Sequence, residues 1–95
     1  MINTMVFNKN RNTSFLYNKL MDMLAAALLD KHVFRNELEI RKFLNKSLSL
    51  EKVKHYYTVN VDGLQATFST NAKNLSPYLL PLADAIAERY TNRIA

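Results

Sequence analysis

The segment YYTVNVDGLQATFS, residues 56–69, constrains the fold more than any other part of the chain. At its centre is the pair Asp62-Gly63, and Gly63 is the only glycine in the sequence. This pair is favoured in two-residue turns that require positive φ at both positions. Such a turn makes the flanking residues two antiparallel strands. The segment is therefore predicted to be a β-hairpin.

The two faces of this hairpin differ in polarity, because strand side chains alternate between faces. The first face is apolar and aromatic, and it carries Tyr57, Val59, Val61, Leu64, Ala66 and Phe68. The second face is mostly polar, and it carries Tyr56, Thr58, Asn60, Gln65, Thr67 and Ser69. An isolated hairpin is marginally stable in water, so helices are expected to cover the apolar face.

Four helices are predicted around the hairpin, mainly from the spacing of apolar residues. Asn36 followed by Glu39 matches a capping box, and Ser49 is a suitable N-cap for a short helix. Pro77 suits the first position of the last helix. The predicted helices cover about residues 13–30, 37–44, 49–55 and 77–93.

The predicted fold class is therefore α+β and mainly helical, with a two-stranded antiparallel hairpin at 56–69 and a C-terminal helix. Residues 1–12 are expected to form a flexible N-terminal arm, with a short strand at 5–7 as an option. Residues 13–95 are expected to form one domain, because a chain of 95 residues is too short for two.

Composition narrows the class of protein. The hydrophobic fraction of 48% suits a packed core, and the absence of Cys excludes disulfides and thiolate metal sites. The longest apolar run, residues 23–29, is far shorter than the roughly 20 residues that span a bilayer. With no visible targeting segment, the chain is expected to be cytoplasmic and not membrane-bound. Frequent Asn with little Gly and no Trp would suit an AT-rich source such as a phage or plasmid.

The net charge of +5 is unevenly distributed. The excess of Lys and Arg lies in residues 1–12 and 31–54, whereas residues 55–95 are balanced. A local excess of positive charge can attract nucleic acid. The alternative is that these side chains only keep the surface solvated, as exposed Lys and Arg usually do.

The order of the predicted elements resembles the winged helix-turn-helix superfamily. A helix, a tight connection at NKS (residues 45–47), a short helix and a hairpin follow one another, and the resemblance covers roughly residues 15–70. It implies that the second and third helices form the reading unit and that the hairpin is the wing. It further implies a transcriptional regulator that binds double-stranded DNA as a dimer. The dimer contact would be the helix at 77–93 or the apolar run 23–29.

The same resemblance implies which residues would touch DNA. The candidates for base edges at the recognition helix are Ser47, Ser49, Lys52 and His55. The candidates for phosphates are Arg41, Lys42, Lys46 and Lys54, with Lys9 and Arg11 in the arm and Asn60 and Gln65 at the wing. DNA affinity is then expected to fall with salt, and to weaken on Lys52→Ala or Arg41→Ala.

Other functions are weighed against this one. His32 and His55 have no obvious partner in sequence, and Asp84 and Glu88 suit the wet face of a helix better than paired catalysis. No motif for a nucleophile, a cofactor or a metal is visible. The chain is therefore expected not to be an enzyme, and to bind neither a cofactor nor a metal. The main alternative is a phage- or plasmid-type factor that binds a host protein complex and modulates it. A third possibility is a component that meets nucleic acid only inside a larger assembly.

Overall fold

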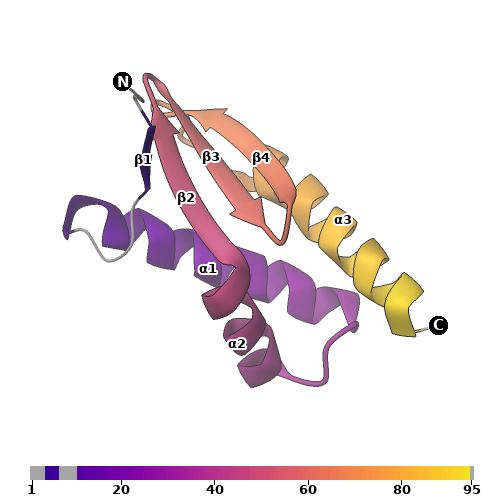
Figure 1. The fold of residues 1–95 in the computed structure, drawn as a ribbon. Helices are drawn as coiled ribbons and strands as arrows, with labels where there is room; N and C mark the ends of the chain where they lie inside the picture. The colour runs from indigo at the N-terminus through magenta and orange to yellow at the C-terminus, as the bar shows by residue number, and fades with distance from the viewer. Residues whose placement is uncertain (1–3, 7–10, 95) are drawn as a thin grey trace.

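Helices and an antiparallel sheet form two layers in the computed structural model, which describes the backbone of residues 4–6 and 11–94 and the side chains of residues 15–91. In chain order the elements are β1 (Thr4–Val6), α1 (Arg11–Lys31), α2 (Glu37–Ser47), β2 (Leu48–Val53), β3 (Tyr56–Val61), β4 (Leu64–Ser69) and α3 (Ser76–Ile94). Figure 1 shows α1 and α3 on one side of the sheet, with α2 turning back from the end of α1 toward β2. The α+β class is thus confirmed.

The sheet is a meander with the strand order β1-β2-β3-β4, in which every neighbouring pair is antiparallel. The strands β2, β3 and β4 have six residues each, and the three-residue β1 extends the sheet beside β2. The sheet is therefore larger than the two-stranded hairpin that the sequence predicts.

The hairpin itself is confirmed residue by residue. Val61 pairs with Leu64 and Tyr56 with Ser69, as a two-residue loop requires. Asp62 has a φ of 52° and Gly63 a φ of 88°, so both turn positions are left-handed. The Gly63 amide donates to Asn60 Oδ1 over 3.1 Å, which ties the loop to β3.

The helix predicted at 49–55 is wrong, because residues 48–53 are the strand β2. Leu48 and Leu50 are buried, whereas Ser49 and Glu51 between them are partly exposed, which is the alternation of a strand. All six residues of β2 pair with β3. This pairing along the whole of β3 outweighs the preference that Ser49 would have as an N-cap.

This correction removes the recognition helix, so the described chain has no helix-turn-helix at 37–55 and the winged-helix arrangement is not confirmed. The helix α2 ends at Ser47 rather than at 44, and α1 begins at Arg11 rather than at 13. The predicted arm is only partly tested, because residues 1–3 and 7–10 lie outside the described residues. Within it, Thr4–Val6 pairs with β2.

The start of α2 follows the predicted capping pattern. Asn36 Oδ1 accepts a hydrogen bond from the Glu39 amide at 2.9 Å. The Glu39 carboxylate accepts from the amide of Arg35 at 3.4 Å, one residue before the cap. Before α2, the ring of Phe34 packs against Phe43 and Tyr90, which anchors the connection from α1.

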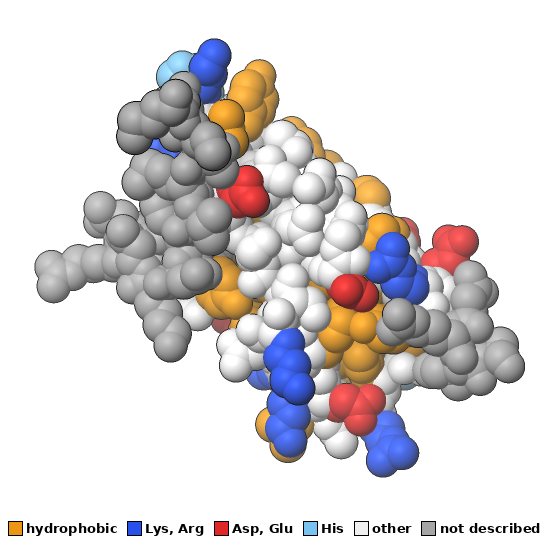
Figure 2. Space-filling model, in the orientation of Figure 1, with side chains coloured by type: hydrophobic (Ala, Val, Ile, Leu, Met, Phe, Trp, Pro, Cys, Tyr) orange, Lys and Arg blue, Asp and Glu red, His pale blue; other side chains and the backbone are white. Residues whose placement is uncertain are grey.

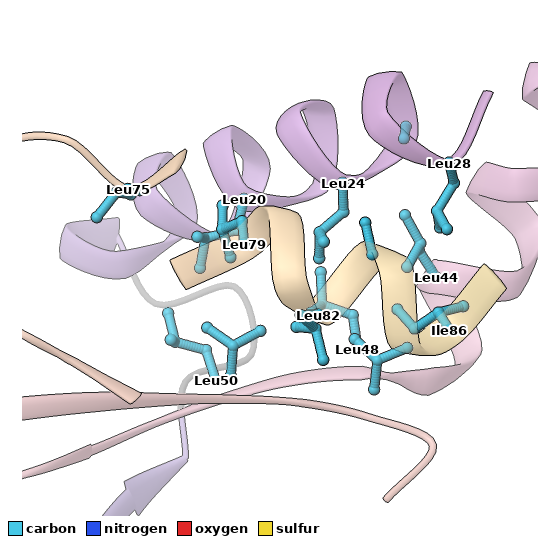
Figure 3. Close-up of a cluster of buried hydrophobic side chains, with 14 of the residues drawn as sticks. Leu20, Leu24, Leu28, Leu44, Leu48, Leu50, Leu75, Leu79, Leu82 and Ile86 are labelled. Atoms are coloured by element: carbon cyan, nitrogen blue, oxygen red, sulfur yellow. The ribbon is translucent and has the colours of Figure 1, made fainter. Parts of the chain in front are cut away.

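The hydrophobic core lies between the helices and the sheet, and Figure 3 shows its leucines converging from both layers. The helices α1 and α3 contribute the upper part of this cluster in that view. Its fully buried members include Leu20, Leu24, Leu28, Ile40, Leu44, Leu50, Val59 and Val61. The described helices cover only one side (Figure 1), and the described side chains on the other side of the sheet are exposed or partly exposed.

Candidate nucleic-acid interface

The accessible side of the sheet, here called the open face, is mostly polar and uncharged. Its side chains alternate with the buried ones and form three rows across β2, β3 and β4. The rows are Ser49, Asn60 and Gln65, then Glu51, Thr58 and Thr67, then Val53, Tyr56 and Ser69. In Figure 2 such uncharged groups (white) cover the middle of the sheet, with Lys and Arg (blue) toward its margins.

The first row brings together three residues that the sequence predicts as DNA contacts. Ser49 lies opposite Asn60, and Asn60 lies opposite Gln65. Asn60 Oδ1 accepts from the Gly63 amide, which leaves its side-chain NH₂ group available to donate to a ligand. The row therefore presents hydroxyl and amide groups, which can donate to phosphate or to base edges.

The second row has a direct link between strands. The hydroxyl oxygens of Thr58 and Thr67 lie 3.3 Å apart, so one donates to the other. Glu51 is the only carboxylate of the open face, and it is partly buried beside Thr58. It will oppose a phosphate nearby, so contacts with an anion are favoured toward the two ends of the face.

One end of the open face is basic. The turn between β2 and β3 consists of Lys54 and His55, both exposed. The amide of Thr70 donates to the His55 carbonyl at 2.8 Å, which brings the loop before α3 against this turn. That loop carries the exposed Lys73. Tyr56, the first residue of β3, follows this turn, and its ring is exposed.

The other end of the open face lies next to the end of α2, where Lys42 and Lys46 are exposed. Arg41 differs from them, because its guanidinium donates to Glu37 over 2.8 Å and to Asp22 over 2.9 Å. The hydrogen bond to Glu37, and to a smaller extent that to Asp22, raises the pKa of Arg41. Arg41 therefore joins α1 to α2, and its charge is already balanced.

Not all of the predicted contacts fall on the open face. Lys52 lies in the row of Tyr57 and Phe68, on the side of the sheet that faces the helices, and Ser49 lies on the other side. A helix would have placed Ser49 and Lys52 together. Lys9 is outside the described residues, and only the backbone of Arg11 is described. Ser47 ends α2 and is partly buried.

Sequence reasoning missed three members of this surface. Thr58 and Thr67 were expected on the polar face of the hairpin but not in a binding site, and Lys73 was not among the predicted contacts. For Thr58 and Thr67, the signal is the alternation of Leu48 and Leu50 with Ser49 and Glu51, whereas no sequence pattern indicates where Lys73 lies. Read as a strand, that alternation extends the polar hairpin face into a three-stranded surface.

Other kinds of site find little support in the described part of the chain. No three His, Asp or Glu side chains there gather as metal ligands would. No helix there is long and apolar enough to cross a membrane. No protein-family model matches this chain, and the searches of curated proteins and of solved structures found no match.

Proposed function

We propose that this chain binds double-stranded DNA through the open face, as a small regulator-type protein of the cytoplasm. The observation that supports this best is the row of Ser49, Asn60 and Gln65 on an accessible sheet with lysines at both ends. Strands as well as helices can lie against DNA. DNA thus remains the expected ligand, but a sheet face rather than a recognition helix would contact it.

Charge supplies the main attraction in this proposal. Four lysines at the two ends make no ion pair with any described residue, and these are Lys42, Lys46, Lys54 and Lys73. By contrast Lys31, Arg41 and Arg89 are paired with Asp84, with Asp22 and Glu37, and with Asp62. The unpaired lysines can release counterions from DNA without first breaking a contact within the protein.

The spacing of these lysines also suits a duplex. Lys46 and Lys54 flank β2, so the strand rise places them roughly 20 Å apart. The major groove is about 12 Å wide, so such a pair can reach phosphates on both of its sides. The hydroxyl and amide groups between them would then face the groove.

The test is fluorescence anisotropy of a labelled random-sequence duplex at a series of salt concentrations. If each of the four lysines meets one phosphate, the affinity should fall about 100-fold between about 50 and 200 mM salt. Lys46→Ala and Lys54→Ala should each reduce the log–log slope by about one. Gln65→Ala should weaken binding with little change in that slope.

The matched control is Lys19→Ala, which removes the same charge from an exposed position of α1, in the helical layer. It should leave the salt slope nearly unchanged. Equal effects of Lys19→Ala and Lys54→Ala would show that only the net charge matters, and would refute an interface on the open face. A folded protein that does not bind the duplex at low salt would refute DNA binding altogether.

A further inference from the structure

The strand β4 is the outer strand of the sheet, because it pairs with β3 and with no other described strand. Its sequence LQATFS has neither a charged residue nor a proline. Edge strands are usually protected from pairing with other chains by Lys, by Pro or by a bulge. Here that protection is missing over the whole six-residue strand.

The free edge has a defined set of backbone groups. In an antiparallel pair, residues alternate between those that bond the neighbour and those that point away. Thr70 donates to His55 of the neighbouring segment, so the even-numbered positions bond toward β3. Gln65 and Thr67 therefore direct their N–H and C=O groups outward. Ser69 also lies on this side, but its carbonyl already accepts from the Ala72 amide at 3.0 Å.

An apolar groove runs beside this edge, between β4 and α3. Its first part is a hollow of about 310 Å³, which Ala66 lines together with Pro77, Tyr78 and Pro81. Ala85 lines both this hollow and the next one, where it meets Leu64. The helix α3 thus presents the large ring of Tyr78 at one end of the groove and the small methyl group of Ala85 toward the other.

We infer that the groove and the edge are filled by a second copy of this chain, with the two β4 strands antiparallel about a two-fold axis at Ala66. In this register Gln65 pairs with Thr67 of the other copy twice, so the four outward groups of each copy are all bonded. A shift by one residue would place the apolar face of one copy beside the polar face of the other. A shift by two residues toward the end of β4 would require the Ser69 carbonyl, which already accepts from Ala72, and the opposite shift would pair Thr67 with Gly63 in the left-handed turn.

The side chains beside the edge are also self-complementary in this register. Tyr78 packs near Phe68, with ring centroids 5.8 Å apart, and Ala85 lies by Leu64. The two-fold axis brings Phe68 of one copy opposite Leu64 of the other. It therefore sets the half-exposed Tyr78 against the small Ala85 of the partner helix. A large group opposite a small one lets both copies fill the groove.

The low charge of this surface is compatible with a second copy of the chain. Two copies with a net charge of +5 each repel each other. This repulsion is weakest when the surfaces that meet are neutral. The strand β4 has no charge, and the only charged residues in the two hollows of the groove are the neighbours Glu88 and Arg89. Because the edge lies beside the open face, the dimer would continue that face across the axis without depending on DNA.

Sedimentation velocity on the full chain without DNA tests this inference directly. The wild type should be a dimer at micromolar concentrations, and Thr67→Pro should raise its dissociation constant about tenfold or more, because two of four interchain hydrogen bonds are lost. Proline removes an outward N–H that the ladder to β3 does not use, so the monomer should keep its circular dichroism. Thr67→Val keeps the N–H and should still dimerise.

Single cysteines provide a second measurement, since the chain has no native Cys. Ala66→Cys should form a disulfide-linked dimer on mild oxidation, because residues opposite each other at a non-bonded position have Cα atoms about 4.5 Å apart. The control Ala26→Cys lies in the hollow between α1 and α3, on the outer side of the helices. Leu80→Glu, with Leu80 52% exposed in the same hollow, should not change the dimer.

The outcomes separate this dimer from other arrangements. Dimerisation that is lost in Thr67→Pro, with crosslinking through Ala66→Cys only, supports the pairing of β4. A dimer that survives Thr67→Pro but is lost in Leu80→Glu refutes it in favour of the helix surface. A chain that stays monomeric refutes it too. In that case a foreign extended peptide that binds at this edge would support the host-protein alternative instead.

Discussion

Replacing Leu50 by Ala tests the strand that replaces the predicted recognition helix. Leu50 lies within β2, opposite Val59, and its side chain has no exposed surface. The expected helix at 49–55, with Ser49 as its N-cap, would instead have placed Leu50 in its first turn. The strand and the helix therefore predict different costs for removing this side chain.

The expected loss follows from complete burial. Truncating a fully buried Leu to Ala costs about 2–5 kcal/mol, because hydrophobic transfer is lost and a cavity is left. A domain of this length is stable by roughly 5–14 kcal/mol in total. At about 3 kcal/mol, the melting temperature of Leu50→Ala should fall by roughly 12–24 °C.

Thermal and urea unfolding, followed by circular dichroism, measure this loss. Leu38→Ala is the matched control, because Leu38 in α2 is 63% exposed and the same atoms are removed. It should change the free energy of unfolding by no more than about 0.5 kcal/mol. A small effect of Leu50→Ala, equal to that of Leu38→Ala, would refute the burial of Leu50 and with it the register of β2.

Two further substitutions test local features of the fold. Gly63→Ala should cost about 1–2 kcal/mol in urea unfolding from backbone strain alone, because φ is 88° and an added Cβ meets nothing within 4 Å. No loss would mean that the turn is not left-handed at this position. Burial raises the pKa of the Tyr17 hydroxyl, which donates to the Leu48 carbonyl at 3.3 Å. The stability that it contributes should be present below pH about 10 and be lost as the pH rises through the raised pKa. Tyr17→Phe should remove that alkaline loss from the pH dependence of unfolding, and an unchanged profile would contradict the assignment.

The parts of the fold that were predictable from sequence are those fixed by neighbouring residues. Asp62-Gly63 determines a turn through its own φ angles, and the register of the hairpin follows from the turn. Asn36 caps α2 through the amide of Glu39, three residues away. Both features depend on contacts within a few positions, so the local pattern contains the necessary information.

The strand at 48–53 was missed because its turn to β3, Lys54-His55, has none of the Asn, Asp or Gly residues that mark a two-residue hairpin turn, although Lys54 has a φ of 55°. Its residues include Glu51 and Lys52, which favour helices, after the possible N-cap Ser49. Pairing along the whole of β3 decides the conformation instead. Strand preference is largely packing against neighbouring strands, which a single segment does not reveal.

In the candidate site too, some features were predictable from sequence and others were not. Asn60 and Gln65 were expected on one face because the hairpin was recognised, and the structure places Ser49 in their row. The pairing of Arg41 with Asp22 joins residues 19 positions apart, so charge counting along the chain could not find it. Fold topology therefore decides which cations are free to meet a ligand.

Lys54 is both a strained residue of the turn between β2 and β3 and a proposed contact for DNA. Its φ of 55° is left-handed, where a non-glycine residue is disfavoured by roughly 1–2 kcal/mol. Lys54→Gly relieves this strain but raises the entropy of the unfolded chain, so stability should be unchanged or higher by up to about 1 kcal/mol. The same change removes a cation from the basic end, so DNA affinity at low salt should fall several-fold and its salt slope by about one. Opposite effects on unfolding and on DNA binding would indicate that the lysine serves the ligand rather than the turn. If Lys54→Gly left the affinity for DNA unchanged, this end of the open face would have no part in binding.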